Sequence, residues 1–216
     1  SSAASDVYKR QELCRKQSIY FDPATEDLET IQHHTVDFLG INQYYPKRVR
    51  APRYQWNEET PFHPERYYEV FDLPGKKMNN SRGWEIYPKI MYDIAMYLKE
   101  NYHNIPWLIT ENGMGREHEE QYMDEKGIVQ DDYRIEFIGQ HLRYLIKAAE
   151  EGANCEGYML WAFTDCVSPM NAFKNRYGLV RIELNDERSR ILKKSASWYQ
   201  SLIDKRELNL PNESYK

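Results

Sequence analysis

Short apolar runs alternate with apolar residues at helical spacing along most of the chain. The runs have the length of strands, and they predict strands at residues 36–44, 107–111, 158–163 and 179–184. Between and after these runs, apolar residues recur every three or four positions, which predicts amphipathic helices. Strands that alternate with helices are typical of a parallel sheet covered by helices, so the pattern predicts an α/β fold. No internal repeat or domain linker interrupts it.

The first two predicted helices have recognisable starts. Asp22-Pro23 suits a helix start and places Leu28 and Ile31 on one face. Pro88 suits the first turn of the second helix, because proline has no N–H to satisfy there. The apolar positions of the second helix are Ile90, Ile94 and Leu98.

A longer helix and a closing helix follow the second strand. The longer helix begins at about Asp131 and ends near Gly152, where glycine suits a helix C-terminus. Its predicted apolar stripe consists of Ile135, Ile138, Leu142, Leu145 and Ala149. The closing helix is predicted around residues 195–203.

A long stretch without regular periodicity separates the first strand from the second helix. It covers residues 46–82, and loops of this length in a compact domain are usually functional or disordered. Its basic residues include Lys47, Arg48, Arg50 and Arg53 near its start. A basic loop can bind nucleic acid, but we interpret this one as a solvated rim of a binding-site mouth.

Composition and charge narrow the range of functions. The chain of 216 residues has a net charge of -5, which disfavours a general attraction to nucleic acid. No apolar run reaches the length of a membrane span and no signal peptide is recognisable, so we expect a cytoplasmic protein without a membrane partner. Cys14, Cys155 and Cys166 are odd in number and lack metal-binding spacing. We therefore expect no metal, no other cofactor and no disulfide framework.

Glu111 is the strongest candidate for chemistry. It ends the apolar strand 107–111 and is followed at once by the turn residues Asn112 and Gly113. A carboxylate at the end of a buried strand lies at the rim of the sheet, where partners must offset its desolvation. In a barrel of parallel strands and helices, that rim is the face that carries catalytic residues.

Three sequence blocks around Glu111 resemble glycoside hydrolase family 1, the retaining β-glycosidases. The blocks are Asp-Phe-Leu-Gly-Ile-Asn-Gln-Tyr-Tyr at 37–45, Ile-Thr-Glu-Asn-Gly at 109–113 and Gly-Tyr-Met-Leu-Trp-Ala-Phe at 157–163. The likeness continues through Gly-Trp-Glu-Ile-Tyr-Pro at 83–88, Asn-Arg-Tyr-Gly-Leu at 175–179 and Lys-Lys-Ser-Ala-Ser-Trp-Tyr at 193–199. The blocks follow the family's order from about Tyr20 to the C-terminus.

The resemblance implies part of a (β/α)8 TIM barrel. A complete barrel takes about 250 residues, and the blocks correspond to about the last three βα units. We therefore interpret residues 12–216 as the C-terminal half of a family 1 barrel, incomplete in this chain. Residues 1–11 match nothing in the family, and we interpret them as a non-native or disordered N-terminal segment.

The family's acid/base glutamate is not found in this chain. In the family it lies in a T-x-N-E-P motif on an earlier strand, and no such motif occurs here. Residues 56–61, Trp-Asn-Glu-Glu-Thr-Pro, imitate it but follow the first block and have no strand before them, so we interpret them as a solvated loop. The isolated chain is therefore expected to be inactive, as part of an enzyme or as a non-catalytic remnant that binds a sugar or sugar phosphate.

The resemblance assigns roles to five residues near the strand ends. Glu111 is implied as the nucleophile and Tyr44 as the phenol that orients it. Asn42 is expected to hydrogen-bond towards the sugar or the acid/base group. Trp161 is implied as the floor of the sugar site and Trp84 as a wall on the leaving-group side. Without the resemblance, strand-end or core positions would be the simpler interpretation for all but Glu111.

Sugar-6-phosphate specificity is implied by the loop after the third strand. Members that cut unphosphorylated glucosides usually carry a glutamate where this chain has Ser168, and a carboxylate there would repel a phosphate. The 6-phospho-β-glucosidase branch has this serine, followed by a lysine and a tyrosine. Tyr177 falls where the tyrosine is expected, but the lysine position two residues earlier holds Asn175, with Lys174 beside it. Lys174 is therefore a substrate-binding candidate of weaker fit, and Arg176 contributes either to the phosphate or to a structural ion pair.

The resulting expectation is hydrolysis of a small-molecule β-glycoside, most like a 6-phospho-β-glucoside. The alternative within the family is a β-glucosidase or β-galactosidase acting on unphosphorylated sugars. The sequence does not choose a gluco-, galacto- or manno-configured sugar, an aglycone or an oligomeric state.

We predict that this chain on its own self-associates or is poorly soluble. Three barrel strands cannot close, so two sheet edges and one apolar interior face stay uncovered. Sedimentation velocity would test this, and a sharp monomeric boundary together with cooperative melting would contradict it.

Overall fold

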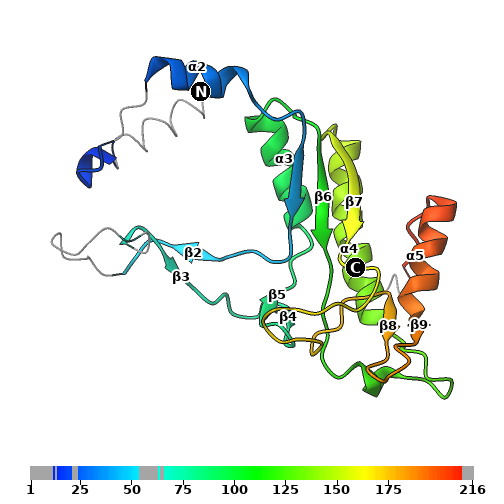
Figure 1. Cartoon of the computed structure of the whole chain (residues 1–216). Coiled ribbons are helices and arrows are strands. Elements are labelled where there is room, and N and C mark those ends of the chain that lie inside the picture. The colour runs from blue at the N-terminus through cyan, green and yellow to red at the C-terminus, as the bar shows by residue number, and fades with distance from the viewer. Residues whose placement is uncertain (1–11, 13, 21–23, 54–62, 64–65, 211–216) are drawn as a thin grey trace.

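A three-stranded parallel sheet forms the centre of the protein, which is described by a computed structural model over residues 12, 14–20, 24–53, 63 and 66–210. Its strands are β1 (Leu39–Asn42), β6 (Trp107–Asn112) and β7 (Cys155–Leu160), in the order β1-β6-β7 (Figure 1). All neighbours pair in parallel, with Ile109 opposite both Ile41 and Tyr158. The predicted parallel α/β arrangement is confirmed.

Two helices cover one face of this sheet. They are α3 (Ile90–Asn101), which precedes β6, and α4 (Asp132–Glu150), which connects β6 to β7. Trp107 and Ile109, two apart on β6 and both fully buried, point to this face. The core cluster around them consists of Met91, Ala95, Leu98, Leu145, Ala148 and Ala153. Burial of this apolar layer fixes the two helices against the strands.

The α4 stripe differs from its prediction at one position. Ile135, Ile138 and Leu145 are buried as expected, but Ala149 is exposed and Ala148 is fully buried instead. A helix turns about 100° per residue, so a step of three from Leu145 stays on the core face at this end of the helix. Packing against α3 decides between a step of three, to Ala148, and a step of four, to Ala149.

One predicted helix lies exposed in the described part of the chain. Helix α2 (Thr25–His33) contains Leu28 and Ile31, which are 51% and 68% exposed, and no α2 residue is buried. The proposed start at residues 22–23 lies outside the described residues, as do residues 1–11, so the interpretation of that segment remains a prediction.

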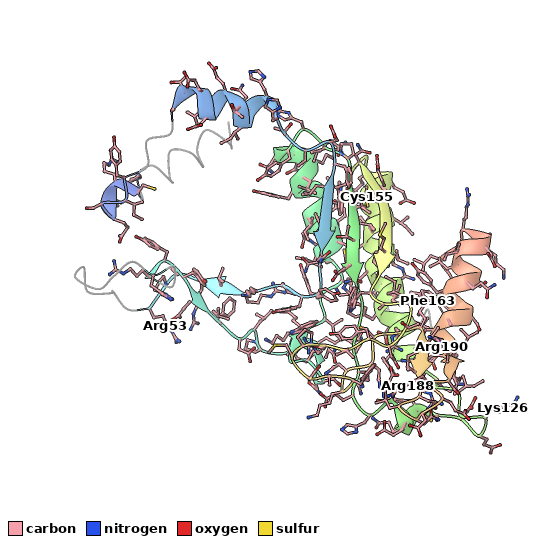
Figure 2. The ribbon with its side chains drawn as sticks, viewed as in Figure 1. Arg53, Lys126, Cys155, Phe163, Arg188 and Arg190 are labelled. Atoms are coloured by element: carbon pink, nitrogen blue, oxygen red, sulfur yellow. The ribbon has the colours of Figure 1, made fainter. Side chains whose placement is uncertain are left out.

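The last predicted strands have different ends from those expected. Strand β7 starts three residues earlier than predicted and ends at Leu160, so Trp161 and Phe163 follow the strand (Figure 2). Strand β8 (Val180–Ile182) pairs antiparallel with an unpredicted strand, β9 (Arg190–Leu192). The closing helix α5 (Lys194–Lys205) is confirmed.

The stretch predicted to be irregular contains two short antiparallel pairs. They are β2 (Val49–Arg50) with β3 (Glu69–Val70), and β4 (Met78–Asn79) with β5 (Trp84–Glu85). Three of its described arginines are held by carboxylates: Arg48 binds Glu85 at 2.5 and 3.0 Å, and Arg50 and Arg53 both bind Glu69. Paired in this way, they do not form a free basic surface.

A buried cluster of charged side chains fastens the loops at the carboxyl end of the sheet. Glu119, from the 3-10 helix η2 (Glu119–Tyr122), accepts from Arg134 Nη2 and from Lys193 Nζ, both at 2.5 Å. Lys193 Nζ also lies 2.9 Å from Asp165 Oδ1, and Arg134 also pairs with Asp131. The exposed fraction of each of these five side chains is 5% or less. The cluster joins the loops after β6 and β7 to the starts of α4 and α5.

The charge balance of the cluster keeps Glu119 ionised. Burial alone would raise the pKa of Glu119, but the charges of Arg134 and Lys193 and the hydrogen bond from Tyr133 outweigh burial and lower it from 4.5. The resulting stability is fully present above pH 4.5 and is lost as the pH falls through the lower pKa of the folded state.

The sheet face opposite α3 and α4 is closely spaced between β1 and β6. A Cβ on Gly40 would lie 2.9 Å from Cγ2 of Thr110, so these two residues share this face. Asn42 belongs to it as well, since Thr110 Oγ1 donates to Asn42 Oδ1 at 2.6 Å. Gly40 and Asn42 are exposed, so the described part of the chain leaves this face open.

We predict that Lys193→Met lowers the free energy of unfolding by about 3–5 kcal/mol. The substitution removes the ammonium between Glu119 and Asp165 and leaves two buried carboxylates with less compensation. Urea unfolding followed by circular dichroism, at low protein concentration, measures the change.

Lys194→Met is the matched control. Lys194 pairs with Asp132 in a bridge whose side chains are 42% and 51% exposed, so its loss should cost less than about 1 kcal/mol. Equal destabilisation by both variants would contradict the role of the buried cluster.

Candidate active site

The carboxyl ends of β1 and β6 bring Glu111 and Tyr44 together. Asn42 pairs with Glu111 across the sheet, and Tyr44 follows β1 by two residues. The phenol Oη of Tyr44 donates to Oε2 of Glu111 at 2.7 Å. Burial, followed by this hydrogen bond, raises the pKa of Tyr44 well above its ordinary value. Tyr44 therefore remains a neutral donor, and its hydrogen bond orients the Glu111 side chain.

A shift in strand register positions Glu111. The pairing of β1 with β6 changes between Ile41 and Asn42, so Asn42 faces Glu111 instead of Thr110. Asn42 accepts a hydrogen bond from Thr110 and is exposed on the open face of the sheet. Its amide nitrogen has no partner in the described part of the chain, so it is available to a ligand.

Asn112 is a fastening residue that sequence reasoning treated only as a turn former. It is fully buried, and its Nδ2 donates to the carbonyl of Gln43 at 2.7 Å. Its Oδ1 accepts from the Tyr158 hydroxyl at 2.7 Å, and its carbonyl accepts from Trp161 N at 2.8 Å. Asn112 thus ties the ends of all three strands together. The asparagine type indicates an amide that can hydrogen-bond to several neighbouring strands. The strand order is needed to tell which strands those are.

Gly113 allows the backbone at Trp161 to approach β6. A Cβ on Gly113 would lie 1.8 Å from the carbonyl oxygen of Trp161, so no other residue fits without a backbone shift. Trp161 is 39% exposed, and its position next to the end of β6 is consistent with a surface for a ligand.

Aromatic and cationic groups enclose Trp84 at the start of β5. Tyr45 stacks on the indole with ring centroids 4.7 Å apart, and the Arg82 guanidinium lies 4.3 Å from the Trp84 centroid. The Tyr44 ring is 5.5 Å away and tilted. These three groups pack around the indole of Trp84.

Tyr177 borders the same cluster from the loop after β7. Its ring centroid lies 6.5 Å from that of Tyr44, and Gly115 is needed beside it because a Cβ there would come within 2.4 Å of the ring. Tyr177 is 6% exposed. Burial raises the pKa of its phenol, while the nearby Arg82 charge acts in the opposite direction.

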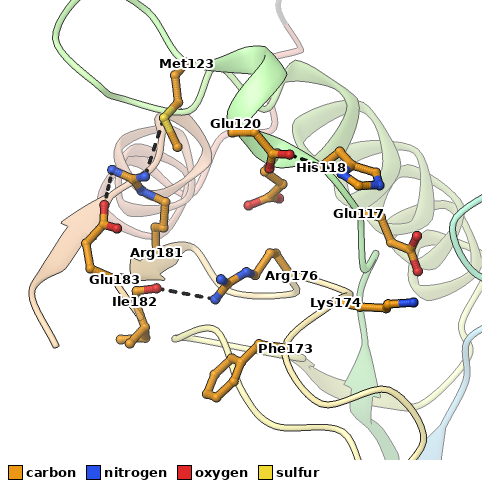
Figure 3. A pocket seen from close by; sticks show the side chains of 11 residues that line it. Glu117, His118, Glu120, Met123, Phe173, Lys174, Arg176, Arg181, Ile182 and Glu183 are labelled. Atoms are coloured by element: carbon orange, nitrogen blue, oxygen red, sulfur yellow. Dashed lines mark hydrogen bonds and ion pairs between the residues drawn. The ribbon is translucent and has the colours of Figure 1, made fainter. Parts of the chain in front are cut away.

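Ser168 and Lys174 lie on the same loop as Tyr177 but differ in their surroundings. Ser168 pairs with Ala172 through both backbone groups, and its Oγ accepts from Met170 N at 3.2 Å. Lys174 is exposed and lines a cavity of about 430 Å³ together with Glu117 and Arg176 (Figure 3). In Figure 3 its ammonium points away from Arg176.

This cavity is separate from the Glu111 cluster, by which we mean Glu111, Tyr44, Trp84 and Tyr177. Its lining carries four glutamates, Glu117, Glu119, Glu120 and Glu183, and the basic residues His118, Lys174, Arg176 and Arg181. Neither Glu111 nor Tyr44, Trp84, Trp161, Ser168 or Tyr177 belongs to it. The structure therefore does not bring Lys174 to the other candidate residues, and its role stays a prediction.

Asn175, at the predicted lysine position, and Arg176, the next residue, both have structural partners. Asn175 is 1% exposed, and its Nδ2 donates to Glu117 Oε1 at 3.2 Å and to the Ser81 carbonyl at 3.5 Å. Arg176 lies 3.5 Å from Asp165 Oδ2, which favours the structural ion pair that the sequence left open.

No group of three or more metal-ligating side chains is found within the described residues. None of the described helices is long and apolar enough to cross a membrane.

The fold and the strand-end carboxylate define a partial (β/α) barrel of the glycosidase type. The sequence profile of Glycosyl hydrolase family 1 matches residues 6–208, so the chain belongs to this family. The predicted family and the predicted incomplete TIM barrel are thereby confirmed.

Named relatives and solved structures agree with this assignment. The chain is 48% identical over 193 residues to the 6-phospho-beta-glucosidase GmuD of Bacillus subtilis, covering 89% of this chain and 42% of the relative. It is 34% identical over 190 residues to a 6-phospho-beta-galactosidase of Staphylococcus haemolyticus, covering 80% of this chain and 38% of the relative. The chain thus spans less than half the length of these relatives.

Solved structures of the family also match most of this chain and less than half of their own length. The family 1 β-glucosidase of Thermotoga maritima superposes with a TM-score of 0.70 at 28% identity, covering 85% of this chain and 38% of that one. Its complex with castanospermine gives a TM-score of 0.72 at 26% identity, covering 91% and 41%.

We predict that Gly113→Ala destabilises the protein by about 1–3 kcal/mol, because the added methyl group overlaps a backbone oxygen and must displace it. The displacement also moves Trp161, so tryptophan fluorescence should change. Gly157→Ala is the matched control on β7, since a Cβ there meets nothing within 4 Å. Urea unfolding of both variants measures the difference, and similar values would refute the close approach.

Proposed function

We propose that this segment forms the nucleophile half of a retaining β-glycosidase that hydrolyses 6-phospho-β-glucosides. The observation that supports this most directly is the 2.7 Å hydrogen bond between Tyr44 and Glu111 at the carboxyl end of a parallel sheet. The chain's 48% identity to a 6-phospho-beta-glucosidase supports the substrate class.

In the proposed reaction, Glu111 attacks the anomeric carbon of the bound sugar. The bond to the leaving-group oxygen breaks as a second carboxyl group, about 5–5.5 Å from the first in retaining enzymes, gives that oxygen its proton. The product of this step is a glycosyl ester on Glu111. Water then attacks the same carbon, gives up a proton to the second carboxylate and releases Glu111, which leaves the anomeric configuration retained.

The surrounding residues serve binding and orientation in this proposal. Tyr44 holds the Glu111 carboxylate in one direction through its hydrogen bond. The free amide nitrogen of Asn42 binds a sugar hydroxyl near the reacting carbon. Trp161 offers an apolar surface to the sugar ring and Trp84 an edge to the leaving group.

A serine at position 168 supports a phosphorylated substrate. A hydroxyl donates a hydrogen bond to a phosphate oxygen, whereas the glutamate of other family members would repel it. Tyr177, buried beside Tyr44, supplies a second neutral donor for the same group. Phosphorylated sugars of this kind are intracellular, so we propose a cytoplasmic location.

Two other functions remain open to test. Hydrolysis of unphosphorylated β-glucosides or β-galactosides is favoured by Asn175, which stands where the phosphate-binding lysine is expected. Sugar or sugar-phosphate binding without catalysis is favoured for the isolated chain, which lacks the T-x-N-E-P motif. General acid/base groups contribute about 10²- to 10⁴-fold, so the chain alone should have little activity.

A hybrid enzyme tests the proposed reaction. Residues 12–216 replace the matching segment of the Bacillus subtilis relative, and a 2-deoxy-2-fluoro-β-glucoside 6-phosphate with a good leaving group is added. We expect a stable glycosyl ester on the peptide that contains Glu111, because fluorine slows its hydrolysis. Peptide mass spectrometry detects the added mass.

The substitution Glu111→Gln should abolish labelling and hydrolysis of p-nitrophenyl 6-phospho-β-glucoside, since an amide is not a competent nucleophile. Glu117→Gln is a control that changes an acidic residue outside the Glu111 cluster. Labelling at another carboxylate would reject Glu111 as nucleophile, and faster hydrolysis of the unphosphorylated glucoside would favour the alternative substrate.

A further inference from the structure

The candidate site contains one cation that the assigned residues do not include. Arg82 lies in the turn between β4 and β5, and its guanidinium lies over the ring of Trp84, on which Tyr45 also stacks. Its charge also acts on the phenol of Tyr177. Arg82 thus lies next to Trp84, one of the aromatic residues that border Tyr44.

Arg82 has no carboxylate partner in the described part of the chain. Its Nε is buried and without a hydrogen-bond acceptor. Most other arginines near the loops are neutralised: Arg48 by Glu85, Arg134 by Glu119 and Arg176 by Asp165. A partly buried guanidinium with unused donors is costly unless a ligand satisfies them.

The turn that carries Arg82 is rigid and tied to the neighbouring loops. Gly83 has a φ of +67°, and the N–H groups of Arg82 and Gly83 both donate to the Asn79 carbonyl. Ser81 Oγ accepts from Glu117 N at 3.1 Å, and Asn79 Nδ2 donates to the Gly115 carbonyl at 2.9 Å. These bonds hold the arginine in place without using its side chain.

Asn175 connects this turn to the loop expected to bind phosphate. Its Nδ2 reaches the carbonyl of Ser81, the residue before Arg82. The amide thus occupies the position expected for a cationic lysine and instead fastens the turn that presents a cation. Lys174, the other cation of the loop, lines the separate cavity with Glu117.

We propose that Arg82 is a specificity-determining residue that binds the 6-phosphate of the substrate, in place of the lysine missing at position 175. This inference rests on the proposed function. The planar guanidinium donates in parallel to two phosphate oxygens, and the indole of Trp84 fixes its plane. Its positive charge also offsets the repulsion between a phosphate dianion and the Glu111 carboxylate.

Binding to the chain itself tests the proposal. Isothermal titration with glucose 6-phosphate and with glucose gives the preference of the wild type for the phosphorylated sugar. Arg82→Gln should weaken glucose 6-phosphate binding by about tenfold to a hundredfold and leave glucose binding unchanged, since a charged hydrogen-bond pair is lost. Arg82→Lys should lie between the two, because it keeps the charge and loses the planar fork.

Two further variants separate the possible explanations. Arg190→Gln removes an equal charge from the exposed strand β9, away from the β4–β5 turn, and should change neither affinity (Figure 2). Lys174→Gln is the competing substitution. If it removes the preference for glucose 6-phosphate and Arg82→Gln does not, the role of Arg82 is overturned while the proposed function stands.

A wild type without preference for glucose 6-phosphate overturns both the role of Arg82 and the proposed phosphate specificity. The same variants in the hybrid enzyme provide a second measurement that does not depend on the stability of the chain alone. There, Arg82→Gln should lower the ratio of kcat/KM for the phosphorylated over the unphosphorylated p-nitrophenyl glucoside by the same tenfold to hundredfold. An unchanged ratio would reject Arg82 as the phosphate ligand.

Discussion

The buried ion pairs around Glu119 are the constraint on which the carboxyl-end loops depend. These loops are long and polar, so apolar burial alone cannot hold them. Arg134 and Lys193 bring together segments that are far apart in sequence and pair with Glu119 and Asp165 out of contact with water. Removing charges from water is costly, and the cluster is favourable only because nearly every charge has a partner at hydrogen-bond distance. Asp165 lies in the loop after β7 that also carries Ser168 and Tyr177, so the geometry of that loop depends on this cluster.

The candidate site contains both a carboxylate, Glu111, and a nearby cation, Arg82. Tyr44 stays protonated and donates to the Glu111 carboxylate, which suits a nucleophile that must remain ionised. Arg82 is held over Trp84 with donors to spare. A substrate with an anionic group at one end and an electrophilic carbon at the other satisfies both. This arrangement explains how a phosphorylated sugar could enter a site that already contains a carboxylate.

The sheet described here also shows what the remaining barrel strands must supply. The face that carries Gly40, Asn42 and Thr110 is open, although α3 and α4 cover the other face completely enough to bury Trp107. The chain spans 42% and 38% of two relatives, and the second carboxyl group of a retaining mechanism is expected on an earlier strand.

The sequence by itself determined the main helices and strands, the parallel α/β arrangement and the carboxylate at the end of β6, because each follows from local periodicity and strand length. It could not find β2 to β5 or β9, since strands of two or three residues have no period and form only through distant partners. The rotation that buries Ala148 instead of Ala149 was set by packing against α3. Tertiary structure alone decided that Lys174 lines a separate cavity while Arg82 lies beside Trp84 and Tyr177. The direction of a loop side chain depends on the path of its backbone, and here that path is fixed by hydrogen bonds from Asn79 and Asn175 to residues distant in the sequence.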